Sequence, residues 1–135
     1  MINFYLYHND DLDNCSIYQQ PLSYMGFNHA FNGFEKIMHI IRKDPYHATL
    51  FACYKINGRW PAAEPYIMKN PYWAVSYAVK VIHHRWLEAE PYIMEDPFSA
   101  YHYASDIIGH RWVQAEHIIG QDADWWKPYC ERFEL

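Results

Sequence analysis

Residues 59–78 read RWPAAEPYIMKNPYWAVSYA, and residues 85–104 read RWLEAEPYIMEDPFSAYHYA. Over the full period of 26 residues, the segments 59–84 and 85–110 are identical at 14 positions. The Arg-Trp pair returns a third time at 111–112, again 26 residues further on. A fixed period of this length is typical of repeats that stack and share one continuous core. This duplication decides the fold, because it predicts an array of similar layers.

Weaker copies flank the two clear ones. The copy before them has Phe34 in place of the tryptophan, and the copy after them has no proline behind Asp122. Degenerate end copies are expected in a repeat array, because the end layers face solvent on one side. We expect four units, at 33–58, 59–84, 85–110 and 111–135. Residues 1–32 fall outside the period and predict a small N-terminal cap with a short strand and a loop.

Each unit predicts two helices. An N-cap residue stands directly before proline at Asp44-Pro45, Asn70-Pro71 and Asp96-Pro97. Such a pair is typical of a helix start, because the cap accepts from an unpaired N–H and proline has none to lose. Apolar residues at helical spacing follow every pair and predict one buried stripe per long helix.

The other half of each unit is shorter. Between Trp60 and Met68 we expect one or two turns, partly 3₁₀, because Pro65 removes a backbone hydrogen bond. Fuller helices are expected in the outer units, for example where His117 replaces this proline. Gly58 is expected to end a long helix as its C-cap. The predicted fold is therefore all-α, a solenoid-like array of about four two-helix units.

Composition and charge limit the function. The chain has 135 residues, 19% of them aromatic, and a formal net charge of −5. That charge argues against general binding to DNA or RNA backbones. No signal peptide and no apolar run of about 18 residues is visible in the sequence, so we expect no membrane span. Cys15, Cys53 and Cys130 form no CxxC pair and are expected to be reduced thiols of a cytoplasmic protein.

The stretch 59–78 resembles a tandem repeat found in many proteins of tailed bacteriophages. The segment Glu64 to Met68 is its most specific part, and the resemblance covers roughly 100 residues of the chain. This chain departs from the pattern at Phe34 and between Gly120 and Trp126. The resemblance implies a small phage accessory protein in a bacterial cytoplasm, by analogy an inhibitor of host defence such as an anti-CRISPR protein. It supplies no catalytic residue.

Two charged positions recur in the two clear units and in the last one. They are Arg59, Arg85 and Arg111 together with Glu64, Glu90 and Glu116. An active site occurs once in a protein, so we interpret these repeated charges as a structural ladder in which each Glu pairs with its Arg across a turn. His84 and His110 also repeat, but no HExxH or CxxC motif accompanies them. We expect no metal, no cofactor and no catalytic group.

The aromatic residues carry the functional hypothesis. Phe51, Tyr77, Tyr103 and the tryptophans at 60, 86 and 112 are expected in the core. Seven rings fall off the buried stripe and are candidates for partner binding: Tyr46, Tyr72, Trp73, Phe98, Tyr101, Trp125 and Trp126. Stacked layers would align them on one face, and Trp and Tyr dominate protein interfaces. The alternative, that these rings only fill out a small core, stays open.

The sequence therefore predicts a non-catalytic protein that docks on a host protein. A nuclease or another nucleic-acid-handling protein is the expected partner, because an acidic surface competes for a basic groove. Two alternatives remain open at this stage. One is sequestration of a nucleotide-type ligand, with the arginine ladder holding its phosphates. The other is an enzyme whose site lies outside the repeat consensus. A homodimer through the open C-terminal end is also compatible with the sequence.

Overall fold

The computed structural model describes residues 31–135, with side chains from Glu35 onward. This part of the chain consists of helices and turns and contains no strand. The predicted all-α repeat array is confirmed there. The predicted N-terminal cap lies outside the described residues, except that helix α3 already begins at Phe31.

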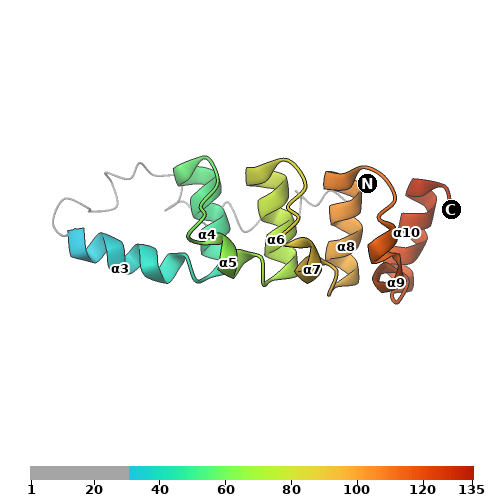
Figure 1. The fold of residues 1–135 in the computed structure, drawn as a ribbon, viewed down its shortest axis with the longest axis horizontal. Helices are drawn as coiled ribbons and strands as arrows, with labels where there is room; N and C mark the ends of the chain where they lie inside the picture. Colours follow the sequence, from blue (N-terminus) through green and yellow to red (C-terminus); the bar gives the residue numbers. More distant parts are fainter. Residues whose placement is uncertain (1–30) are drawn as a thin grey trace.

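Four long helices stand side by side and run in the same direction (Figure 1). Their bounds are α4 (Pro45–Phe51) with its continuation η3 (Ala52–Ile56), α6 (Pro71–Tyr77) with η4 (Ala78–Ile82), α8 (Pro97–Tyr103) with η5 (Ala104–Ile108), and α10 (Ala123–Phe133). Each contacts the next, so the layers follow one another along the long axis of the molecule.

Shorter segments connect the long helices. They are α3 (Phe31–Ile41), α5 (Glu64–Ile67), α7 (Glu90–Ile93), and the 3₁₀ turn η6 (Val113–Ala115) followed by α9 (Glu116–Ile119). The first unit has the expected fuller helix, and α3 lies crosswise to α4 (Figure 1). The last unit has no fuller helix, since α9 is four residues long, as α5 and α7 are. Proline is therefore not what shortens these helices: Pro65 lies in the first turn, where its missing N–H loses no bond.

The predicted N-caps are present. Asp44 accepts from the Tyr46 N–H, Asn70 from Trp73 and Asp96 from Ser99. The last long helix is capped in the same way although it has no proline, because Asp122 accepts from the N–H of Asp124. A capping oxygen is thus common to all four layers, and the proline behind it is dispensable.

The C-terminal ends of the first three long helices differ from the sequence prediction. Their last turns are π-helical and close on a residue in the left-handed region, with φ of 54° at Asn57, 63° at His83 and 75° at Gly109. The prediction of Gly58 as the C-cap glycine was wrong by one residue, because the wider turn ends at Asn57. The backbone N–H groups of His83 and Gly109 donate to carbonyls five residues earlier, at 2.7 and 2.8 Å.

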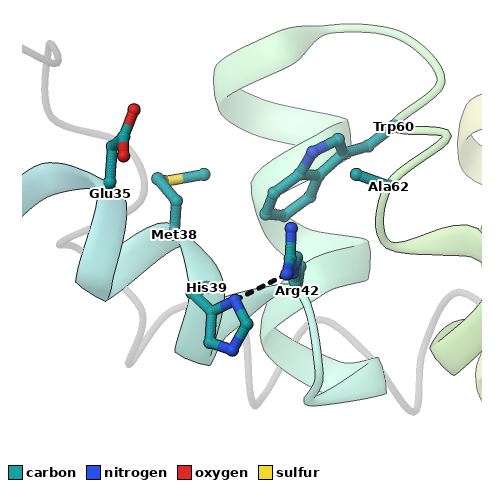
Figure 2. A pocket seen from close by; sticks show the side chains of 6 residues that line it. All are labelled: Glu35, Met38, His39, Arg42, Trp60 and Ala62. Carbon is teal, nitrogen blue, oxygen red and sulfur yellow. Dashed lines mark hydrogen bonds between the residues drawn. The ribbon is translucent and has the colours of Figure 1, made fainter.

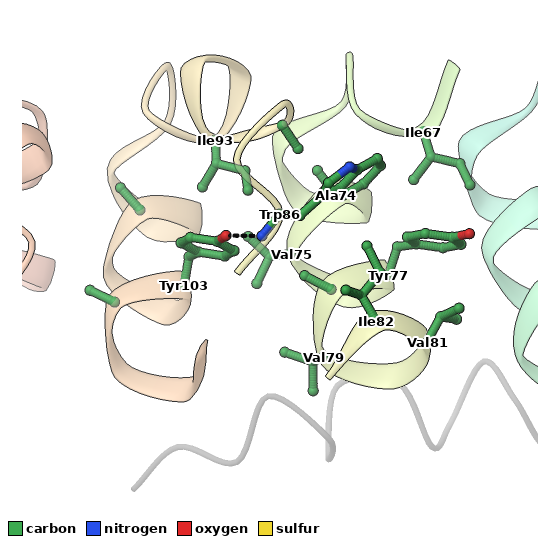
Figure 3. Packing of buried hydrophobic residues seen from close by; sticks show 14 of the residues in the cluster. Ile67, Ala74, Val75, Tyr77, Val79, Val81, Ile82, Trp86, Ile93 and Tyr103 are labelled. Carbon is green, nitrogen blue, oxygen red and sulfur yellow. Dashed lines mark hydrogen bonds between the residues drawn. The ribbon is translucent and has the colours of Figure 1, made fainter. Parts of the chain in front are cut away.

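The core is continuous through the layers because small residues face each other. Two alanines in each of the first three long helices are fully buried, at 48 and 52, 74 and 78, and 100 and 104. Between the layers, the tryptophan of each unit packs on the aromatic ring of the preceding long helix (Figure 3). The centroid distance is 5.2 Å in all three cases: Phe51–Trp60, Tyr77–Trp86 and Tyr103–Trp112.

In the last long helix, two aromatic rings of α10 pack on the ring of Tyr129. Tyr129 is fully buried. Trp126 stacks on its ring at 5.7 Å and 16°, and Phe133 meets the ring edge-on at 4.8 Å. Both come from α10, so they take the place that the next tryptophan holds in the inner layers. Trp126 therefore contributes to the core at this end.

Candidate functional site

The repeated charges form paired side chains inside each layer. Arg59 donates from Nε and Nη2 to the two carboxylate oxygens of Glu64, at 2.8 Å each. The pairs Arg85–Glu90 and Arg111–Glu116 have the same bidentate geometry at 2.8 to 2.9 Å. The carboxylates lie largely inside, while the arginine side chains are 43 to 47% exposed. Each pair spans the turn between a long helix and the next short one.

A tyrosine joins each pair to the backbone. The Tyr103 hydroxyl accepts from the backbone N–H of Trp86 at 2.6 Å and donates to Oε1 of Glu90 at 3.2 Å. Tyr77 and Tyr129 make the same two bonds in their own layers (Figure 3 shows the Tyr103–Trp86 bond). We call each Arg, Trp, Glu and Tyr set a quartet. Its members occupy positions i, i+1, i+5 and i+18 of the repeat.

The quartet of Arg59 holds its carboxylate in the ionised form. Burial raises the pKa of Glu64, but the hydrogen bonds from Arg59 and Tyr77 outweigh it, so the pKa lies below its ordinary value. In the same layer, burial raises the pKa of Tyr77, and the neighbouring carboxylate raises it further. A carboxylate that already accepts three donors is a poor general base. The arrangement is suited to holding the turn and the short helix of each layer to its long helix.

These bonds also bear on the ligand-sequestering alternative. The arginine donors Nε and Nη2 of Arg59, Arg85 and Arg111 are engaged by glutamates. A phosphate at these positions would have to displace a bidentate carboxylate. The ladder is therefore a weak candidate for a phosphate site.

Six of the seven candidate rings lie together in one row. They are Tyr46 on α4, Tyr72 and Trp73 on α6, Phe98 and Tyr101 on α8, and Trp125 on α10. The centroids of neighbouring rings are 4.9 to 6.0 Å apart, which is contact distance for aromatic pairs. Every ring in this aromatic row is half-buried and keeps part of its surface accessible. Trp126 does not belong to the row, because it packs on Tyr129.

His102 is a member of this region that sequence reasoning missed. It is 4% exposed and lies against Phe98 at 4.4 Å and Trp125 at 5.6 Å. Its Nδ1 is 3.7 Å from a carboxylate oxygen of Asp106. A serine occupies the equivalent place in the preceding unit, so the repeat gave no signal for it.

Charge is distributed unevenly along the row. Most of the row lies in the first turns of the long helices, next in sequence to the residues at each helix start. At the start of the last two long helices these residues are acidic: Glu95, Asp96 and Asp122 precede the helices and Asp124 lies in the first turn of α10. We call these four the acidic rim. Around α4 and α6 they include Lys43 and Lys69. The half of the row formed by α8 and α10 is therefore both aromatic and negatively charged.

Other site types find little support in this structure. Between residues 31 and 135, no three His, Cys, Asp or Glu side chains gather in a way that could hold a metal ion. Cys53 and Cys130 are free thiols, and Cys15 lies outside the described residues. Within the same range, no helix is both long and apolar enough to cross a membrane.

Comparisons with known proteins assign no identity to this chain. No protein-family model matches it, and neither the curated proteins nor the solved structures contain a significant match. The resemblance to phage repeats remains a prediction from the residues.

Proposed function

We propose that this chain is a non-catalytic protein-binding module that docks through the aromatic row and the acidic rim. The observation that carries the proposal is the continuity of the row across four layers. Aromatic side chains supply much of the energy of protein interfaces, and a row of partly accessible rings is a suitable platform. Partner binding by these rings is our inference from their arrangement.

The partner we propose is a protein with a basic surface. Arginine and lysine side chains bind over aromatic faces and pair with carboxylates, and α8 and α10 offer both kinds of group. Nucleic-acid-handling proteins have such surfaces, and a net charge of −5 favours encounter with them. A role as a phage accessory protein that inhibits a host enzyme in the bacterial cytoplasm fits this surface and is part of the proposal.

A non-catalytic role is favoured by the hydrogen bonds of the repeated polar side chains. The glutamates of the three quartets accept from arginine and tyrosine and face into the layers. Their donors and acceptors serve the fold, which leaves the surface row as the main feature available to a partner.

The test is an affinity capture from bacterial lysate with a charge-reversed rim. Glu95→Lys with Asp124→Lys changes two exposed residues that cap no helix. The matched control, Glu88→Lys with Glu131→Lys, makes the same change in net charge at exposed positions outside the rim. Captured proteins are identified by mass spectrometry and eluted over a salt gradient.

We expect a nucleic-acid-handling protein to be retained by the unchanged chain and by the control. It should be lost with the rim variant and released by salt. Equal capture by the rim variant, or no stoichiometric protein at all, would contradict docking through this surface.

A further inference from the structure

A cavity opens at the end of the array opposite the acidic rim, between α3 and the loop before α5. Its volume is about 470 Å³. The lining residues are Glu35, Met38, His39, Arg42, Trp60 and Ala62 (Figure 2). A cavity of this size is within the range of small-molecule sites.

The composition of the cavity breaks the repeat. Arg42 stands where the next two units have Met68 and Met94, which pack against the core. Met38 stands where they have the buried quartet glutamates. The first unit thus has a charged side chain, Arg42, where the next two units have methionine, and an apolar one, Met38, where they have glutamate. It brings a guanidinium to a place that is apolar in the two following units.

Arg42 has an unused donor at this place. Among the described residues, its buried Nε finds no hydrogen-bond acceptor. Its Nη2 contacts Nδ1 of His39, which can accept because the cations of Lys43 and Arg42 lower the pKa of this histidine. Leaving a charged donor buried and unpaired is unfavourable, so an anionic acceptor would stabilise the site.

Trp60 supplies an accessible aromatic surface. Its equivalents Trp86 and Trp112 are only 2 and 3% exposed, whereas Trp60 is half-buried and lines the cavity. Figure 2 shows the Arg42 guanidinium directed toward the Trp60 ring. A cation and a ring surface therefore meet at one cavity.

We propose that this cavity binds a small organic anion that carries a flat ring. The guanidinium of Arg42, which lines the cavity, pairs with the anionic group, and the ring of the ligand packs on Trp60. The Glu35 carboxylate limits the ligand to one anionic group, because a second would be repelled. Nucleoside monophosphates and aromatic carboxylates share this chemistry. The site is independent of the proposed docking surface, so either idea can fail alone.

The experiment is calorimetric titration of the full chain with AMP and with indole-3-acetate. Adenosine and inorganic phosphate are included as the ring and the anion alone. Arg42→Met is the informative variant, because methionine is the residue of the two following layers and should preserve folding. Lys36→Met is the matched control, since it removes an exposed cation from the adjoining helix α3 outside the cavity.

We expect AMP or indole-3-acetate to bind, and whichever binds identifies the source of the anion. Arg42→Met should weaken that binding tenfold or more, while Lys36→Met leaves it unchanged. The two isolated fragments should bind more weakly than the joined ligand. Absence of binding by both anions, equal binding by Arg42→Met, or phosphate binding as tight as AMP would overturn the proposal.

Discussion

The quartet hydroxyl can be removed with a single atom change, Tyr103→Phe. The Tyr103 ring is fully buried and would keep its contact with Trp112, so the variant tests the hydroxyl and leaves the packing in place. Phenylalanine is tolerated at this position of the repeat, because Phe51 holds it in the first unit and packs on Trp60 in the same way.

The expected cost follows from the two bonds that would be lost. The N–H of Trp86, a residue only 2% exposed, would have no acceptor, and a buried unsatisfied donor costs about 1–3 kcal/mol. Glu90 would lose one donor but keep both bonds from Arg85, which we put at about 1 kcal/mol. The sum is about 2–4 kcal/mol. For a chain of this length it corresponds to a fall in Tm of roughly 8–16 °C.

The assay is urea unfolding followed by circular dichroism, with Tyr92→Phe as the control. Tyr92 is a half-buried tyrosine on α7 outside the quartets, so its variant should change the free energy of unfolding little. Adding Glu90→Met, the residue of the first unit at this place, completes a double-mutant cycle in which the losses should be less than additive. If Tyr103→Phe costs no more than Tyr92→Phe, the hydroxyl does not join the turn and the long helix of its layer as we argue.

Three further measurements test other parts of the fold. His83→Gly should stabilise the chain by about 1 kcal/mol in thermal unfolding, because φ is 63° there and glycine adopts that conformation without strain; an unchanged or lower Tm would contradict the left-handed ending. Asp96→Ala should cost about 1–2 kcal/mol in the same assay by removing the cap of α8, and an unaltered Tm would mean that the cap is dispensable. A profile of Tm against pH should fall on both sides of a plateau. Because the pKa of Glu64 is lowered in the fold, its contribution is present above about pH 4.5 and is lost as the pH falls through the folded value. Because the pKa of Tyr77 is raised, its contribution is present below about pH 10 and is lost as the pH rises from there. If Tyr77→Phe leaves the alkaline fall unchanged, the assignment to this hydroxyl is wrong.

The sequence predicted the repeat and the helix starts well, because both depend on local chemistry. Asn70 and Asp96 each accept from a free N–H group in the first turn of the helix that follows them, which depends only on neighbouring residues. The buried alanines follow helical spacing. The helix ends were less predictable. Gly58 looked like a C-cap, but the π-helical turn moved the left-handed residue to Asn57, and this depends on the backbone of the whole last turn.

The candidate site was predicted in part. Periodicity placed six of the seven rings on a common face, since stacking repeats the same position from layer to layer. Trp126 was assigned to this face, but it packs on Tyr129. This contact joins two residues of one helix that the repeat pattern does not pair, so periodicity did not predict it. Partner binding by the remaining rings stays a prediction.

The first unit shows why the quartet is best understood as one element. Its positions carry Gly33, Met38 and Phe51 in place of arginine, glutamate and tyrosine. Replacing only the arginine would leave a buried carboxylate without its cation, and replacing only the glutamate would leave the tyrosine hydroxyl without its acceptor. Each partial loss leaves a buried side-chain group without its partner, whereas losing all three polar groups together leaves only the backbone N–H to be satisfied, so they change as a set. The same reasoning makes Arg42 notable, because it adds a charge with no salt bridge among the described residues, in the one layer that has given up its quartet.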